Sequence, residues 1–406
     1  MLREGVALAG VLAAICLQVD AGRAQTLATL QGPQPVPARV TSAEDKPAAD
    51  MQETVAWVPV SLKLPDGSNH HGDMVVTHFR PKGDGPFPAL IFSHGRTPSA
   101  RHEPVRWRAI STARYWTRRG FAVLVPTRIG YGEHARIVDP EASGACDTAD
   151  FRPAVRAMTT QIARTVEFAH TLPWVDPGRI VLSGVSYGGF ATIAATAEPM
   201  PGVVGAINFV GGLGGMPQLR PGRPCQAAQS GAIMAAAGAT SSVETLWLYA
   251  DNDAYWGSHW PRRWHEAFTS AGGRSRLKTF PAVGDDGHRL MSRGFRLWRP
   301  EVDRFVKHLG FTLPEAVPAL AASSYAAIED AGKLPHVKPA VRADAYAKFL
   351  AADVPRAFAI APNGAWAWRS GPDAAELAID LCRTHARGQC RLYAVDDRVV
   401  WKPAAR

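Results

Sequence analysis

The residues best suited to chemistry form a serine motif flanked by glycines, Gly184-Val185-Ser186-Tyr187-Gly188. An apolar run, residues 180–183, precedes the motif, and a run with helical character, residues 189–195, follows it. A serine on a sharp strand-to-helix turn is strained and exposes its hydroxyl, and small residues beside it leave room for both elements. The pattern predicts Ser186 as a nucleophile with the Tyr187 N–H aimed at the group it attacks. The alternative is an ordinary glycine–serine turn.

A serine nucleophile needs a base to take its proton and a carboxylate to orient that base, and both types of residue follow later predicted strands. Asp251 and Asp253 come directly after the apolar run 246–250. His288 follows the run 277–280 through a turn-rich segment. The order serine, aspartate, histidine is one of the known triad orders. We therefore predict His288 as the general base and one of the two aspartates as the orienting acid.

The elements that must position these groups alternate between strands and helices along the chain. A hairpin of residues 55–62 and 73–79 opens the series. Strands are then expected at residues 89–92, 121–125, 180–183, 204–209, 246–250 and 277–280, and helices at 110–119, 151–172, 260–271 and 298–309. This alternation predicts an α/β fold with a mostly parallel central sheet and helices on both faces. Ligands of such sheets bind at the carboxyl ends of the strands.

Taken in order, these pieces resemble the α/β-hydrolase superfamily, in its dienelactone hydrolase-like and prolyl oligopeptidase-like branch. The resemblance covers residues 55–310 and is carried by residues 92–95, 125–132, 175–180, 184–189, 249–253 and 287–288. It implies the α/β-hydrolase fold. Dienelactone hydrolases are known for a cysteine nucleophile, whereas this chain has Ser186, so their lactone chemistry is not carried over.

The resemblance also assigns roles at the site. In those families the acid usually ends a Gly-x-x-Asp pattern, which here points to Asp253, with Asp251 as the fallback. Their His-Gly-X arrangement implies that the Arg96 N–H, after His94-Gly95, is the second oxyanion donor beside Tyr187. We expect the Arg96 side chain at the surface, with binding of an anionic group of the substrate as the alternative.

Two aromatic residues are candidates for a substrate pocket because of their places after strands. Tyr131 follows the strand 121–125, and Trp256 follows the acid. We predict both as substrate-binding residues. The alternative for each is packing of a loop against a helix.

Composition excludes several classes of protein. The chain is 46% hydrophobic and 20% charged, which is typical of a globular protein with an ample core. Its net charge of +9 is spread out without a long Lys/Arg block, so nucleic-acid binding is not expected. No glycine-rich phosphate loop, dinucleotide fingerprint or metal-ligand spacing occurs, and we expect no cofactor and no metal.

The N-terminal segment predicts export. Arg3 and an apolar run, residues 6–17, are typical of a signal peptide covering residues 1–24, with Ala21 as an alternative cleavage site. A Pro/Ala-rich tether, residues 25–54, then leads to a hydrolase domain, residues 55–312, and a small α+β module, residues 323–406. No later segment is apolar for long enough to span a membrane. We therefore expect a periplasmic or secreted protein.

The cysteines agree with an oxidising compartment. Of the five, Cys16 would leave with the signal, and four permit three pairings. Cys382 and Cys390 are close in sequence, which favours Cys382–Cys390 and therefore Cys146–Cys225. The alternative is free buried thiols.

The sequence thus predicts a secreted serine hydrolase that cleaves small-molecule carboxylic esters through an acyl-serine. A prolyl oligopeptidase-like peptidase or amidase is the first alternative. That family usually has a propeller domain ahead of the hydrolase domain, and here only residues 25–54 stand there. An acyltransferase and a non-catalytic binding protein on the same fold are further alternatives. The C-terminal module is expected to contact the envelope or a protein, with a lid or brace as the alternative.

Overall fold

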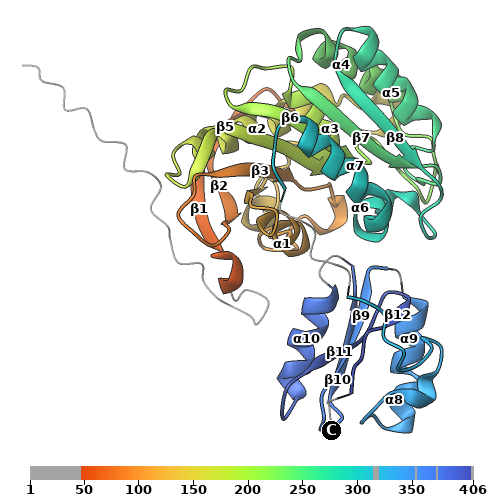
Figure 1. The fold of residues 1–406 in the computed structure, drawn as a ribbon. Coiled ribbons are helices and arrows are strands. Elements are labelled where there is room, and N and C mark those ends of the chain that lie inside the picture. Colours follow the sequence, from red (N-terminus) through yellow and green to blue (C-terminus); the bar gives the residue numbers. More distant parts are fainter. Residues whose placement is uncertain (1–46, 314–319, 353, 372–373, 404–406) are drawn as a thin grey trace, which may run out of the picture. The chain divides into compact units, whose positions relative to one another are not determined.

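The structure, a computed structural model, describes residues 47–313, 320–352, 354–371 and 374–403 (Figure 1). The predicted signal peptide and most of the predicted tether lie outside these residues. One sheet has eight strands and the other has four. We call residues 47–313 the eight-stranded unit and residues 320–403 the four-stranded unit. The domain boundaries given by the sequence remain predictions.

The eight-stranded sheet has the strand order β1-β2-β4-β3-β5-β6-β7-β8. β1 and β2 form an antiparallel hairpin, β2 is also antiparallel to β4, and all later pairings are parallel. The predicted α/β class with a mostly parallel sheet is confirmed. The strands are β1 (Thr54–Lys63), β2 (Asn69–Phe79), β3 (Phe87–Ser93), β4 (Ala122–Thr127), β5 (Val175–Val185), β6 (Val203–Phe209), β7 (Glu244–Ala250) and β8 (Ser275–Phe280).

Helices cover this sheet in two sets (Figure 1). α1 and α7 meet through the rings of Tyr115 and Trp298, 5.3 Å apart. α2 packs on α3, α3 on α4, and α4 on α5. The helices are α1 (Ile110–Thr117), α2 (Arg152–His170), α3 (Tyr187–Ala195), α4 (Ala227–Thr240), α5 (His259–Ser270), α6 (Leu290–Arg293) and α7 (Phe295–His308).

Sequence periodicity missed α4. Its sequence, AAQSGAIMAAAGAT, consists mostly of alanine and glycine and therefore has no strong division between an apolar and a polar face. Close packing against α5 stabilises α4 instead. Gly238, for example, lies so close to Phe268 of α5 that an added Cβ would stand 2.0 Å from the Phe268 carbonyl oxygen.

The four-stranded unit has an antiparallel sheet in the order β10-β9-β11-β12. Small and large side chains alternate on β9: Phe358 and Ile360 join a core with α9, while Ala357 and Ala359 face α10. The disulfide Cys382–Cys390 ties α10 to the start of β11. Its elements are α8 (Pro339–Ala343), α9 (Ala345–Ala351), β9 (Arg356–Ile360), β10 (Trp366–Ser370), α10 (Ala374–His385), β11 (Arg391–Val395) and β12 (Arg398–Val399).

No helix in the described ranges has both the length and the apolar character needed to cross a bilayer.

Candidate active site

Ser186 lies on a tight turn between β5 and α3, as the motif predicts. Its backbone has φ 56° and ψ −126°, a conformation that L side chains rarely adopt, and its N–H donates to the Phe209 carbonyl oxygen at 3.0 Å. Glycine is required at positions 184 and 188, because neighbouring backbone atoms leave no room for a side chain there. A Cβ on Gly184 would stand 2.4 Å from the Gly188 oxygen, and one on Gly188 would stand 2.2 Å from the Ser93 oxygen.

The structure brings Ser186, His288 and Asp253 together from three different strand ends. The distance from His288 Nε2 to Ser186 Oγ is 3.1 Å, and that from His288 Nδ1 to Asp253 Oδ2 is also 3.1 Å. Both are hydrogen-bond distances. The Asp253 side chain has no exposed surface, and the His288 side chain is 13% exposed. This arrangement can pass a proton from the serine hydroxyl to the imidazole.

The structure gives Asp251 and Asp253, the two candidates for the orienting acid, different environments. The second carboxylate oxygen of Asp253 accepts the N–H groups of Tyr255 and Trp256 at 2.8 and 3.1 Å, so the carboxylate cannot rotate freely. Asp251 is 53% exposed and pairs with Arg262 at 3.5 Å. Asp253 is therefore the aspartate in contact with His288.

Aromatic rings enclose His288. The Tyr255 ring stacks on the imidazole at 3.9 Å with an interplanar angle of 23°, and the Trp256 ring approaches it edge-on at 5.5 Å. Trp256 is fully buried, and its indole N–H donates to the Val210 oxygen at 2.8 Å. The structure therefore does not support Trp256 as a residue that touches substrate, because its surface is already taken up by the core. Tyr255 is partly exposed beside His288.

The two amides that the sequence predicts as oxyanion donors belong to Tyr187 and Arg96, which directly follow Ser186 and Gly95 in the chain. Tyr187 is the first residue of α3, so its N–H has no acceptor within the helix. Gly95 lies against the nucleophile: a Cβ added there would be 3.3 Å from the Ser186 Cβ. In the part of the chain that the structure describes, the next amide, Arg96 N–H, has no hydrogen-bond acceptor.

The Arg96 side chain differs from its expected place at the surface. It is only 11% exposed and makes a two-pronged contact with Asp139 at 3.0 and 2.9 Å, with Glu141 3.3 Å away. Burial opposes ionisation, but the Asp139 hydrogen bonds and the Glu141 charge raise the pKa of Arg96 above its ordinary value. The guanidinium is therefore a structural cation.

Tyr131 belongs to the same network and not to an open pocket. It is 1% exposed, and its hydroxyl donates to Glu141 Oε2 at 2.7 Å. Burial and the Glu141 charge raise the pKa of the Tyr131 hydroxyl, which keeps it protonated as a donor. The structure does not support the prediction that Tyr131 binds substrate, because both its ring and its hydroxyl are occupied by protein.

Sequence reasoning missed two residues that hold the site. Asp286 Oδ1 accepts the N–H groups of His288 and Ala254 at 2.9 and 3.0 Å, so it joins the histidine loop to the acid loop. Its position two residues before His288 was the available signal. Arg128 is completely buried behind the loop of His94 and Gly95, and its position just after β4 carried no chemical signal.

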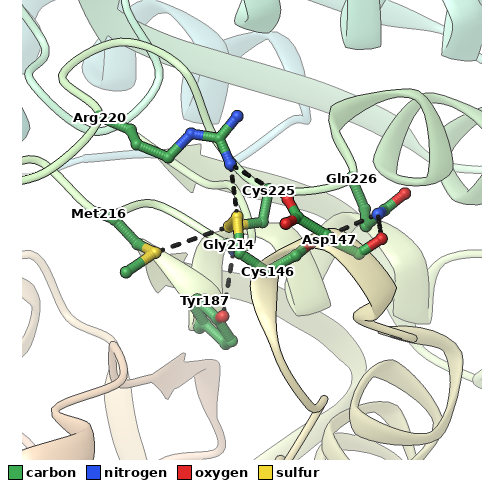
Figure 2. The surroundings of a disulfide bond; sticks show 8 residues. All are labelled: Cys146, Asp147, Tyr187, Gly214, Met216, Arg220, Cys225 and Gln226. Carbon is green, nitrogen blue, oxygen red and sulfur yellow. Dashed lines mark hydrogen bonds and ion pairs between the residues drawn. A yellow bond between two sulfur atoms is a disulfide. The ribbon is translucent and has the colours of Figure 1, made fainter.

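The disulfide Cys146–Cys225 lies near the nucleophile turn (Figure 2). Cys225 N–H donates to the Gly214 oxygen at 2.9 Å, and Gly214 N–H donates to the Tyr187 hydroxyl at 3.1 Å. Arg220 Nη1 lies 2.7 Å from Cys146 Sγ. Both disulfides pair the cysteines as the sequence favoured. This one connects the loop after β4 to the loop after β6, beside Tyr187.

No group of three or more histidine, cysteine or acidic residues within the described ranges is arranged to hold a metal ion.

Part of the eight-stranded unit matches a known protein family. The family model of the X-Pro dipeptidyl-peptidase (S15 family) matches residues 71–266, which include Ser186 and Asp253 but end before His288. No curated protein matches the chain.

Solved structures that are similar to this chain include esterases and peptidases. Acetyl xylan esterase from Paenibacillus sp. R4 is 18% identical, with a TM-score of 0.45 over 65% of this chain and 86% of that one. A puromycin-hydrolyzing peptidase of Mycobacterium tuberculosis is 16% identical, with a TM-score of 0.41 over 63% and 38%. The acylaminoacyl peptidase of Pyrococcus horikoshii is 14% identical, with a TM-score of 0.43 over 66% and 43%.

The strand order, the nucleophile turn and the family match define the class. The chain is a serine hydrolase of the α/β-hydrolase superfamily.

Proposed function

We propose that this serine hydrolase cleaves small-molecule carboxylic esters, with Ser186 as nucleophile, His288 as general base and Asp253 as the orienting carboxylate. One observation carries the proposal: two contacts of 3.1 Å run from Ser186 Oγ through His288 to Asp253. Tyr187 and Arg96 would supply the two oxyanion N–H groups.

The reaction would proceed in two halves. Ser186 Oγ attacks the ester carbonyl carbon while His288 Nε2 takes the hydroxyl proton, and the carbonyl oxygen becomes an oxyanion. Collapse of this intermediate breaks the bond to the alcohol, which leaves with the proton from His288. Water then attacks the acyl-serine with His288 again as base, and the acid and free Ser186 are released.

The charges beside the oxyanion loop favour an ester over a peptide with a free amino terminus. Recognition of a free α-ammonium requires an available carboxylate. Asp139 and Glu141 are the carboxylates next to Arg96, and both are engaged by arginine: Asp139 by Arg96, and Glu141 by Arg128 at 2.6 Å. A neutral ester makes no such demand.

A peptidase or amidase is the second candidate. The observation that favours it is the match of residues 71–266 to the X-Pro dipeptidyl-peptidase family. The same acyl-serine chemistry serves an amide, provided that His288 protonates the leaving amine.

Active-site labelling tests the shared chemistry. Purified protein is treated with a fluorophosphonate probe beside Ser186→Ala, with Ser183→Ala as the matched control because Ser183 lies buried within β5. Labelling of the wild type and of Ser183→Ala, and its loss in Ser186→Ala, is expected. Absence of labelling where a known serine hydrolase reacts would show that the catalytic proposal is wrong.

A substrate panel separates the two candidates. Nitrophenyl esters of increasing acyl length are compared with aminoacyl nitroanilides and X-Pro nitroanilides. We expect kcat/KM to be at least ~10²-fold higher for the best ester than for the best anilide. A higher value for an X-Pro anilide would replace the esterase proposal with the peptidase.

We also propose that the protein is exported and acts in the periplasm or outside the cell. Cys146, Cys225, Cys382 and Cys390, the cysteines of the described residues, are all in disulfides, which persist in oxidising compartments. The test is N-terminal mass analysis of protein from the extracytoplasmic fraction, with cleavage expected after Ala24 or Ala21. Recovery of uncleaved chain with reduced cysteines would contradict export. Contact of the four-stranded unit with an envelope or a protein stays a prediction.

A further inference from the structure

Arg128 has an unusual environment for an arginine. It follows β4 and has no exposed surface. Its Nε donates to Glu141 Oε1 at 2.6 Å, its Nη1 to the His94 oxygen at 2.5 Å, and its Nη2 to the Gly95 oxygen at 3.2 Å. One guanidinium therefore holds two successive carbonyls of the loop that carries the second oxyanion donor.

These contacts fix the direction of a particular amide. In a trans peptide the C=O and N–H groups point to opposite sides of the chain. The Gly95 oxygen turns toward Arg128, in the interior, so the N–H of the same peptide, which belongs to Arg96, turns the opposite way. A Cβ added to Gly95 would stand 3.3 Å from the Ser186 Cβ, so the peptide whose oxygen contacts Arg128 lies beside the nucleophile.

We propose that Arg128 is the positioning residue for the oxyanion hole, setting the direction of the Arg96 N–H through the carbonyls of His94 and Gly95. The inference rests on the proposed acyl-serine mechanism and adds a determinant of its rate. Arg128 does not touch the substrate.

His94 supports the same peptide from its other side. His94 Nδ1 lies 2.7 Å from the Gly95 oxygen, and Arg128 N–H donates to His94 Nε2 at 3.2 Å. Burial, followed by the Arg128 charge, holds the pKa of His94 well below its usual range, so the ring is neutral and Nδ1 carries the proton. Trp107 stacks on the ring at 4.5 Å, which keeps it in place.

The geometry requires an arginine. A lysine could pair with Glu141, but its single ammonium on a flexible stem cannot reproduce a planar fork that reaches a carboxylate and two carbonyls. A buried ion pair is also a weak source of stability, because desolvation of both charges offsets their attraction. A role in orienting the peptide explains why the pair is placed here.

The experiment compares Arg128→Lys with the wild type and with Arg119→Lys. Arg119 donates to a carboxylate and a backbone carbonyl in the same unit, Asp303 and Tyr115, but it follows the carboxyl end of α1, at the opposite edge of the sheet from Ser186. A peptidyl or alkyl trifluoromethyl ketone, which forms an oxyanion on the serine, measures the oxyanion hole directly.

For Arg128→Lys we expect kcat to fall about 10²-fold, KM to change less than about threefold, and the Ki of the ketone to rise by the same factor as kcat falls. Arg119→Lys should leave all three values unchanged. A variant with normal kcat and Ki overturns the inference, as does a loss of kcat with an unchanged Ki.

A second variant covers the case in which Arg128→Lys does not fold. Arg128→Gln with Glu141→Gln removes the ion pair without leaving a lone buried charge. It should show the same joint change in kcat and Ki, and normal values overturn the inference. Fluorophosphonate labelling of the wild type keeps the two proposals distinct: if the wild type labels and these variants keep a normal Ki, only the Arg128 inference fails.

Discussion

The two units of the chain differ in what they bury. Tyrosines apart, every buried polar or charged side chain among the described residues belongs to the eight-stranded unit, and the ionisable ones are Glu53, His78, His94, Arg128, Glu141 and Asp253. The four-stranded unit buries apolar side chains and the rings of Tyr346 and Tyr393. Both units have a disulfide and a covered sheet, so the difference does not come from architecture alone.

The buried charges of the eight-stranded unit are not explained by stability. Burying a charge is unfavourable unless it is paired and hydrogen-bonded, so an interior selected for stability alone avoids it. Three of the buried ionisable groups, Asp253, His94 and Arg128, lie directly behind the proposed catalytic groups. The interior of the four-stranded unit has no comparable cluster among its described residues.

The largest expected effect is a loss of kcat when the buried Asp253 is substituted, with no such loss for the exposed Asp251. Asp253→Asn should lower kcat about 10⁴-fold, because an asparagine amide favours the wrong tautomer of His288. Asp251→Asn, on the half-exposed neighbour, should stay within about twofold of the wild type, since surface ion pairs contribute little. Steady-state ester hydrolysis measures both. Equal losses in the two variants would contradict the assignment of Asp253.

The two disulfides give the next contrast. Removing Cys146–Cys225, which closes a loop of 79 residues, should lower the free energy of unfolding by about 4.5 kcal/mol, against about 2.5 kcal/mol for Cys382–Cys390 with its loop of 8. Only the first double alanine variant should also lose kcat, about threefold to tenfold, because its contacts lead to Tyr187. Urea unfolding and ester hydrolysis provide the values. A loss of kcat on removing Cys382–Cys390 would contradict the expectation that only Cys146–Cys225 affects activity.

The buried His78 is expected to make the stability of the eight-stranded unit depend on pH. Burial, followed by the Arg80 charge, lowers the pKa of His78 to about 4, against about 6.5 in the unfolded chain. The unfolded state therefore binds the proton more tightly. The stability contributed by neutral His78 is present above pH 6.5 and is lost as the pH falls toward 4, by about 3 kcal/mol.

Hydrogen exchange at pH 7 and pH 4.5, followed by mass spectrometry, assigns this loss to one unit. The eight-stranded unit should weaken, and His78→Gln should flatten its pH dependence, whereas His71→Gln, at an exposed position on the same strand, should not. The described part of the four-stranded unit buries no histidine, so its pH dependence should lack this component. An equal loss in both units would argue against His78 as the cause.

The smallest effect is expected at the edge of the site. The Tyr255 ring stacks on His288 and is partly exposed, so Tyr255→Leu should lower kcat about tenfold by releasing the imidazole from its orientation. Tyr255→Phe keeps the ring and should retain activity close to that of the wild type. If phenylalanine lowers kcat as much as leucine, the hydroxyl and not the stack is responsible.

Much of the fold could be predicted because local pattern and global structure agree. The apolar runs that became β3, β5, β6 and β7 are buried on both faces, and such strands show in sequence as continuous apolar stretches. The turn around Ser186 was also visible, since only glycines fit its close contacts. α4 was not visible, because its alanines contact α5 without an amphipathic pattern.

Asp251 and Asp253 cannot be told apart by their place in the sequence. Both follow β7, and the order of residues admits either. Only the turn that lets Tyr255 and Trp256 donate to Asp253 shows which carboxylate reaches His288. The burial of Tyr131 and Trp256 could not be predicted for a related reason, since position after a strand says nothing about depth.

The serine, its turn, the later histidine and the alternation that places them at one edge of a parallel sheet follow from the amino-acid sequence alone, because these features depend on local sterics and on chain order. Which aspartate contacts His288, the inward positions of the Arg96 and Tyr131 side chains, and the contacts of Arg128 with the His94 and Gly95 carbonyls depend on the tertiary structure. Those outcomes depend on burial and on contacts between residues far apart in the chain, such as Arg128 with Gly95 and Glu141.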